Sequence, residues 1–175
     1  MAYRTVLTRQ QLLELQLEIE PLTHGFNWVD DHVVLTDVDG NILYANEGAA
    51  HHTGFSKEEM MGKNPGDLWG GRMEPKFYED MWYTLKVLKV PFRGEVKNRN
   101  KDGTEYWQEL RVFPIFDEHD DVRFMIGMEP DVTVRKVGEE LQDQYVKELE
   151  RLNKYLHEKK LTISELAKEL PRLHF

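Results

Sequence analysis

The segment from Gly94 to Phe116 constrains the fold of this chain most strongly, because it reads as two β-strands joined by a tight turn. Side chains of different polarity alternate on either side of Lys101-Asp102-Gly103, and alternation along the chain is the pattern of a β-strand. Glycine tolerates the positive φ that a chain reversal requires, so this tripeptide supplies the turn. The sequence therefore predicts a β-hairpin in this segment.

Asn98 is the informative residue of the hairpin. The alternation places its carboxamide on the same face as Phe92 and Val96, which is the face that we expect to be buried. A buried polar group without a hydrogen bond costs roughly 1–3 kcal/mol, so Asn98 needs partners. Those partners are either neighbouring backbone groups or a ligand held against the sheet, and the spacing is compatible with both.

The residues before the hairpin predict two short strands followed by helices. The strands are His32–Asp37 and Asn41–Ala45, and Asp39-Gly40 between them is a strong hairpin signal. Asn64-Pro65-Gly66 makes the middle of the chain irregular, and Glu74–Lys89 then repeats apolar residues at helical spacing as the one long helix of the domain. N-caps of two short helices are predicted at Asn46 and Ser56.

The segment from Val122 to Met128 alternates as a fifth strand and completes the order of elements. Two strands, then helices, then three strands predict an α+β fold, in which a five-stranded antiparallel sheet carries helices on one face. We expect amphipathic helices at both ends of this domain. At the N-terminal end, Thr8 to Gln11 is a capping box, Leu15 and Ile19 lie on one apolar face, and Pro21 helps to end the helix. This helix needs a surface to cover, either its own sheet or a second subunit.

From Asp131 the pattern is helical to the end of the sequence. Val137 and Leu141 lie on one apolar stripe, and a stripe in a different register starts at Tyr145 and continues to Leu173. Such a change of register is typical of a stutter in a coiled coil. We therefore divide the chain into an N-terminal cap helix at residues 1–25, a central domain at 26–133, and a C-terminal helical segment for signalling or dimerisation at 134–175.

Composition excludes several classes of function. The net charge of −9 argues against nucleic acid and against an anionic membrane surface as partners. The sequence contains no cysteine, which excludes disulfides, thiolate catalysis, iron–sulfur ligation and cysteine-linked photochemistry. We find no apolar run that could span a bilayer and no signal-peptide pattern, so we expect a cytoplasmic protein.

Several motifs, in their order along the chain, resemble the PAS (PAS/PAC) family of sensory domains. They are TDVDGNILYAN at Thr36–Asn46, TGFSKEEMMGKNP at Thr53–Pro65, MWYTL at Met81–Leu85, GEVKNRNKDGTEYW at Gly94–Trp107 and DVTVRK at Asp131–Lys136. The resemblance implies a PAS fold, with a ligand or cofactor between the sheet and the long helix, and a sensing role rather than an enzymatic one. Asp131 and Thr133 match the junction motif that ties the outgoing helix to the domain, although either residue could also be a simple N-cap.

Within this family, the chain is most similar to the flavin-binding, redox-sensing PAS domains of nitrogen-fixation regulators. The similarity rests on Asn64, Pro65, Leu68, Met81, Trp82, Leu85, Pro91, Gly94, Asn98, Arg99 and Lys101. It implies that Trp82 packs near an isoalloxazine ring, that Asn98 hydrogen-bonds the polar edge of that ring, and that Asn64, Tyr78 and Phe92 are further cofactor-binding residues. The alternative is an ordinary core Trp and a satisfied core Asn. The predicted long helix contains no histidine, which argues against haem.

Two functions remain open on the sequence. The first is a sensor that binds FAD, another flavin or a small ligand, forms a homodimer through its terminal helices, and relays its state through the C-terminal helix to a downstream signalling protein or effector domain. The second is a cofactor-free interaction module for a second copy or a partner protein, with a pocket filled by its own bulky side chains. A roomy cavity would count against the second function.

Overall fold

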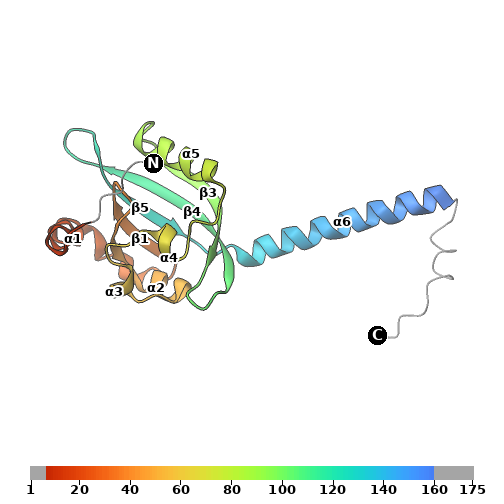
Figure 1. Ribbon diagram of the computed structural model, residues 1–175, viewed down its shortest axis with the longest axis horizontal. Helices are drawn as coiled ribbons and strands as arrows, with labels where there is room; N and C mark the ends of the chain where they lie inside the picture. The colour runs from red at the N-terminus through yellow and green to blue at the C-terminus, as the bar shows by residue number, and fades with distance from the viewer. Residues whose placement is uncertain (1–6, 160–175) are drawn as a thin grey trace. The chain divides into compact units, whose positions relative to one another are not determined.

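The structure, a computed structural model, describes residues 7–159 of the 175-residue chain. Five strands and several helices follow one another in the order expected for an α+β domain (Figure 1). The elements are α1 (Arg9–Thr23), the 3₁₀ turn η1 (Phe26–Trp28), β1 (His32–Asp37), β2 (Ile42–Ala45), α2 (Glu47–Thr53), α3 (Lys57–Met60), α4 (Pro65–Leu68), α5 (Pro75–Lys86), β3 (Phe92–Arg99), β4 (Glu105–Phe116), β5 (Val122–Glu129) and α6 (Thr133–Lys159).

The five strands form one antiparallel sheet with the strand order β2-β1-β5-β4-β3. This confirms the predicted five-stranded antiparallel α+β fold. The β3–β4 hairpin has the predicted register, because Asn98 lies opposite Tyr106 and Val96 lies opposite Gln108. Its turn depends on Gly103, whose φ of +95° lies in the region that favours glycine.

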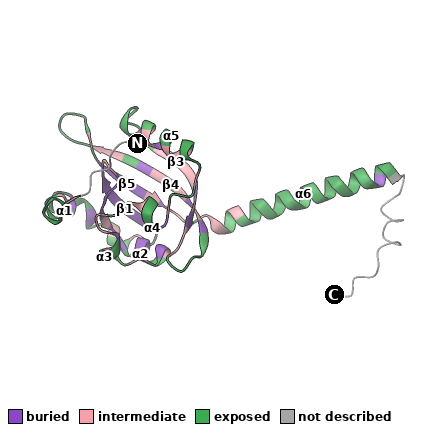
Figure 2. Ribbon diagram, in the orientation of Figure 1, coloured by how far each residue is buried: buried purple, intermediate pink, exposed green. Residues whose placement is uncertain are grey.

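Helices cover both faces of the sheet, and β1 shows how. Leu35 points to one face and packs in a cluster with Ile19 of α1 and Phe124 of β5. Val34 points to the opposite face, where it packs with Met60 of α3 and with Trp69 after α4. The buried residues accordingly concentrate in the strands that lie between these layers (Figure 2). The N-terminal helix thus covers its own sheet, which answers the question that the sequence left open.

The helix ends follow the predicted caps, with one exception in α1. Thr8 forms the capping box with Gln11, Asn46 caps α2, and Ser56 forms a capping box at the start of α3. Pro21, however, lies inside α1, which continues to Thr23. The prediction that Pro21 helps to end the helix was therefore wrong.

The middle of the chain is more regular than the sequence predicted. Asn64 caps a short helix, α4, where we expected irregular structure, and its side chain accepts a hydrogen bond from the Gly66 amide. The long helix α5 ends at Lys86 rather than Lys89, so Leu88 lies beyond it and is exposed. Met81 and Leu85 are the buried residues of this helix, and they face the sheet.

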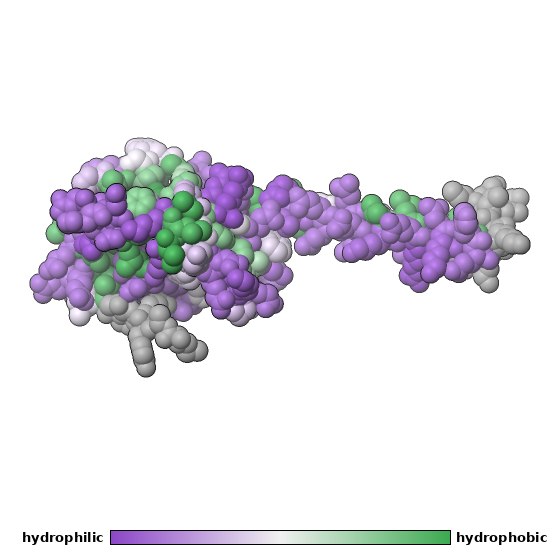
Figure 3. Space-filling model, turned by 90° about the horizontal axis from the view of Figure 1, so that it is seen from above, coloured by the Kyte–Doolittle hydropathy of each residue, from purple (hydrophilic) through white to green (hydrophobic). Residues whose placement is uncertain are grey.

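The chain divides into two compact units between Thr133 and Val134. In the second unit, α6 is a continuous helix whose surface is mainly hydrophilic, with apolar side chains at intervals along it (Figure 3). Its exposed apolar residues include Val137, Leu141, Val146, Leu149 and Leu152. The part of the predicted apolar stripe that falls in residues 160–175 lies outside the described residues. Among the described helices, none is long and apolar enough to cross a membrane.

Candidate functional site

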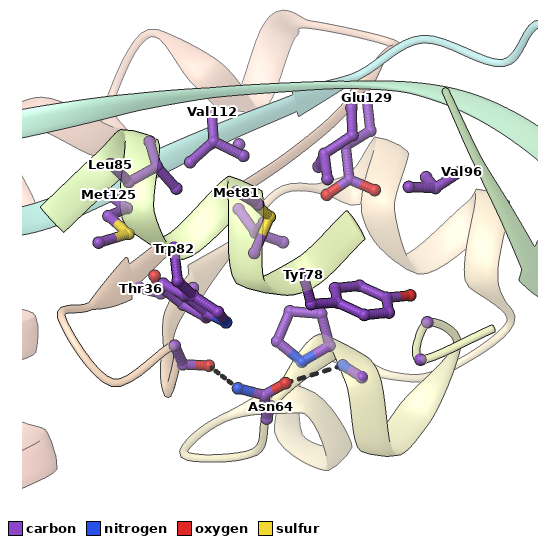
Figure 4. A pocket seen from close by; sticks show the side chains of 18 of the residues that line it. Thr36, Asn64, Tyr78, Met81, Trp82, Leu85, Val96, Val112, Met125 and Glu129 are labelled. Atoms are coloured by element: carbon purple, nitrogen blue, oxygen red, sulfur yellow. Dashed lines mark hydrogen bonds between the residues drawn. The ribbon is translucent and has the colours of Figure 1, made fainter. Parts of the chain in front are cut away.

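A cavity of about 620 Å³ lies between the sheet and α5 (Figure 4). Its walls are mainly apolar, with side chains from the helix on one side and from the inner face of the strands on the other. The apolar lining residues include Val34, Trp69, Met81, Trp82, Leu85, Val96, Leu110, Val112 and Met125. A cavity of this size falls in the range of small-molecule sites, roughly 300–1,000 Å³.

Trp82 forms a wall of the cavity at the end where α5 meets the β1–β2 turn. The Nζ of Lys86 lies 4.7 Å from the centre of the Trp82 ring, and the same Nζ lies 3.8 Å from a carboxylate oxygen of Asp39. All three residues line the cavity. The indole thus lies between its own helix and the turn. Its packing against an isoalloxazine ring stays a prediction.

Asn64 lines the cavity, but its amide is committed to backbone groups. Its Nδ2 donates to the carbonyl of Gly40 at 3.0 Å, and its Oδ1 accepts from the amide of Gly66 at 2.9 Å (Figure 4). Gly40 has a φ of +79°, and a Cβ at this position would lie 2.6 Å from Asn64 Nδ2 and 3.2 Å from the Trp82 ring. Asn64 therefore fastens the β1–β2 turn to α4 and shapes the cavity wall.

A chain of buried amides forms the polar end of the site. Asn98 lines the cavity and is almost fully buried, and its Nδ2 donates to Gln108 Oε1 at 2.7 Å. Gln108 is fully buried, and its Nε2 donates to the backbone carbonyl of Glu129 at 2.7 Å. The partner of Asn98 is thus another side chain, which is neither of the two partners that the sequence suggested.

Glu129 is a buried carboxyl group that lines the cavity, and its carboxyl points into the cavity space (Figure 4). Burial raises the pKa of Glu129 to about 8, and a hydrogen bond from Trp69 opposes that shift. Burial lowers the pKa of the fully buried His32 to about 3. Their nearest polar atoms are 3.8 Å apart. Burial thus disfavours the charged form of both groups, and it opposes an ion pair at this contact.

Tyr78 and Phe92 occupy different places. The Tyr78 ring lines the cavity, and its hydroxyl accepts a hydrogen bond from the amide of Met73 at 3.2 Å. Phe92 lies outside the residues that line the cavity. Its ring packs edge-on against Phe77, with 5.4 Å between the ring centres. Of the five predicted cofactor-binding residues, the cavity thus brings together Asn64, Tyr78, Trp82 and Asn98.

The family of the chain follows from a comparison with known sequences. Residues 30–134 match the family model described as "PAS domain". The chain belongs to the PAS domain family. The PAS domain includes every strand of the sheet and every residue that lines the cavity, so the site described above is the interior of the PAS fold.

Individual relatives agree with this assignment. The PAS domain is 29% identical over 102 residues to a nitrogen fixation regulatory protein of Klebsiella oxytoca, an alignment of 58% of this chain and 20% of that protein. The chain is 30% identical over 124 residues to a blue-light photoreceptor of Listeria monocytogenes, covering 69% of this chain and 48% of that protein. A solved light-oxygen-voltage domain superposes with a TM-score of 0.58 at 22% identity, over 73% of this chain and 96% of the other. The chain thus spans about a fifth to a half of the length of these sequence relatives.

The junction after β5 is attached to β4 through both predicted relay residues. Asp131 Oδ1 accepts a hydrogen bond from the amide of Thr133 at 2.7 Å, and Asp131 forms an isolated β-bridge with Gln108. The hydroxyl of Thr133 accepts from the amide of Trp107 at 2.9 Å. The amide of Val132 donates to the Trp107 carbonyl at 2.9 Å. These contacts go beyond a helix N-cap, because they tie the start of α6 to the central part of the PAS sheet.

Sequence reasoning missed three residues of the polar end, namely His32, Gln108 and Glu129. The predicted fifth strand ended at Met128, one residue before Glu129, whereas β5 includes Glu129. A signal was nevertheless present, because Glu129 falls two positions after Gly127 on a strand that is buried on both faces. A charged residue on the inner face of a buried strand marks a candidate site.

Proposed function

We propose that this PAS domain is a sensory module that binds a flavin in the cavity between the sheet and α5. The observation that carries the proposal is the cavity itself, which combines mainly apolar walls with the hydrogen-bonding side chains of Asn98 and Glu129. A planar heteroaromatic ring with one hydrogen-bonding edge fits such a site. The similarity to a light-oxygen-voltage domain whose mechanism has been probed with a flavin analogue supports the same ligand class.

The residues present fit a flavin in kind. Trp82 offers a large rigid wall for the ring system. Asn98 and Glu129 offer hydrogen bonds to the polar edge, and Gln108 behind them fixes the orientation of the Asn98 amide. A bound flavin supplies redox and light-absorbing chemistry, whereas the chain binds it, orients it and excludes water. On this proposal the PAS domain acts as a sensor and not as an enzyme.

The proposal extends to a relay and a dimer. A ligand that changes the packing around Gln108 acts on the strand that also holds Asp131 and Thr133, and so biases the junction that precedes α6. The exposed apolar residues of α6 and of α1, such as Leu141, Leu149 and Leu17, support pairing with a second copy. The recipient of the signal is a downstream protein or effector domain, and the place of action is the cytoplasm.

The second candidate function, a cofactor-free interaction module, required a pocket filled by its own side chains. The bulky residues Trp69, Trp82, Met81 and Met125 are present, but they line the cavity rather than fill it. The volume of about 620 Å³ therefore favours the ligand-binding function.

An absorption spectrum of the purified full chain tests the proposal. We expect the visible bands of a flavin, and acid extraction followed by chromatography then identifies it as FAD, FMN or riboflavin. A colourless preparation is to be incubated with each of these flavins and then freed of unbound ligand. If no flavin remains with the protein after this reconstitution, the proposed ligand is wrong and the interaction module becomes the working function.

A further inference from the structure

Glu129 is a buried carboxyl group whose charge state is not evident from the fold alone. Its carboxyl group is almost fully buried, at 4% exposure, yet it points into an apolar cavity rather than toward a cationic partner (Figure 4). An isolated buried carboxylate is costly, and buried charges are normally paired. The charge state of Glu129 therefore depends on the groups that face it.

The hydrogen bonds of Gln108 determine the state of the nearest basic group. Gln108 Nε2 donates to the Glu129 backbone carbonyl, which can only accept, and Gln108 Oε1 accepts from Asn98. The backbone carbonyl thus fixes the orientation of the Gln108 amide. The same Nε2 lies 3.1 Å from His32 Nδ1, and an amide NH₂ cannot accept a hydrogen bond. His32 Nδ1 must therefore be the acceptor, which makes the ring neutral with its proton on Nε2.

The other neighbours of Glu129 carry no charge either. His32 faces it from β1, and Trp69 donates a hydrogen bond to it from the end of α4. Tyr106 of β4 is close enough for a charge on Glu129 to raise the Tyr106 pKa. Burial raises the pKa of Tyr106 far above neutrality, so its phenol is neutral. The 3.8 Å between Glu129 Oε2 and His32 Nδ1 is longer than a hydrogen bond. Among the described residues, the groups that face this carboxyl are thus neutral, and the only hydrogen bond given to it comes from Trp69. This environment favours Glu129 as a neutral acid, and its carboxyl group points into the cavity (Figure 4).

We propose that Glu129 binds the flavin as a neutral carboxylic acid, donating a hydrogen bond to an acceptor atom on the edge of the ring, and that flavin affinity is therefore linked to one proton. This inference rests on the proposed function and names the residue that selects the ligand's polar edge. His32 is a positioning residue in this arrangement: because it is held neutral by Gln108, it gives Glu129 no ion-pair partner. The ligand that fits presents a hydrogen-bond acceptor to Glu129.

Equilibrium titration of the full chain with FAD across a range of pH tests this inference. We expect the dissociation constant of the wild-type protein to be constant below neutrality and to rise by about tenfold for each pH unit above about 8, where the acid ionises. Glu129→Gln keeps an N–H donor and cannot ionise, so it should bind with a dissociation constant that does not change with pH. Glu129→Leu also cannot ionise but has no hydrogen-bond donor, so it should bind more weakly than Glu129→Gln at every pH.

Other results of these titrations would overturn either the inference or the proposed function. If the wild-type protein and Glu129→Gln show the same pH profile, or if Glu129→Leu binds as tightly as Glu129→Gln, the inference is overturned while flavin binding stands. If the wild-type protein binds none of FAD, FMN and riboflavin at any pH, the proposed function fails and this inference fails with it. A carbon-13 NMR titration of the ligand-free protein, with Glu129→Gln to assign the signal, gives an independent readout. A midpoint near the ordinary value of 4.5 would contradict the neutral acid.

Discussion

The backbone amide of Trp107 donates a 2.9 Å hydrogen bond to the hydroxyl of Thr133, which joins strand β4 to the first residue of α6. The next residue along β4, Gln108, is the centre of the polar end of the cavity. Trp107 therefore binds the junction through its backbone, and the adjacent Gln108 forms the polar end of the cavity with its side chain. A displacement of β4 at this point must affect both.

Thr133→Val should loosen this junction, because it removes the hydroxyl that accepts from Trp107 while it keeps the shape of the side chain. We expect a loss of about 1 kcal/mol in the free energy of unfolding and faster hydrogen exchange at the Trp107 amide. Thr133→Ser keeps the hydroxyl and is the matched control. Exchange at Trp107 that is equally slow in the valine variant would show that the hydroxyl does not hold the junction.

Asn98→Leu should destabilise the PAS domain by about 1–3 kcal/mol even without a ligand, because it leaves the buried Gln108 Oε1 without its donor. Lys97→Ala is the control on the opposite face of the same strand. Lys97 forms an exposed ion pair with Glu105, and such pairs are worth roughly 0–1 kcal/mol. Urea unfolding of both variants makes the comparison. Equal losses in the two variants would mean that the Asn98–Gln108 bond contributes little.

Glu129 should make the ligand-free protein less stable as the pH rises. Its folded pKa of about 8 lies above its ordinary value of 4.5, so between these values the folded state holds a proton that the unfolded state has lost. The free energy of unfolding should fall by about 1.4 kcal/mol for each pH unit in this window. The effect is clearest between pH 6.5 and about 8, above the ordinary pKa of His32. In denaturant unfolding, Glu129→Gln should not show this fall in the free energy of unfolding with pH. If the variant loses stability with pH as steeply as the wild-type protein does, groups other than Glu129 cause the loss.

His32 should produce the opposite effect on the acid side. Its folded pKa of about 3 lies below its ordinary value of 6.5, so the unfolded state binds a proton that the folded state refuses, and stability falls as the pH drops through this window. Between 4.5 and 6.5 the contributions of His32 and Glu129 oppose each other, so His32 should dominate only below 4.5. His32→Phe should reduce the loss of stability in acid, as measured by thermal unfolding at a series of pH values. If His32→Phe loses as much stability in acid as the wild-type protein does, His32 is not a buried neutral imidazole.

Trp82→Ala should weaken flavin binding by about twofold to tenfold, which corresponds to the roughly 0.5–1.5 kcal/mol of an aromatic contact. Tyr83→Ala is a matched control, because Tyr83 follows Trp82 on α5 but is exposed to solvent. Fluorescence titration with FAD compares the two variants with the wild-type protein. If both variants bind equally well, the indole does not form a wall of the flavin site.

Local patterns predicted most of the fold, because turns, caps and alternation depend on nearby residues. The Lys101-Asp102-Gly103 turn and the inward position of Asn98 were predicted in this way and are confirmed. The partner of Asn98 was not predictable, because a side-chain bond to Gln108 depends on rotamers that no spacing specifies. Glu129 was missed for a related reason: alternation separates the two faces of a strand but does not say which face borders a cavity.

The attachment of the junction has a practical consequence for protein engineering. The bonds that hold it to β4 come from backbone groups and from the side chains of Asp131 and Thr133. They place no demand on the identity of the residues that follow Thr133. A chimaera that joins a different effector helix directly after Thr133 therefore keeps these contacts with β4. The length of that helix then becomes a design variable that can be altered one residue at a time.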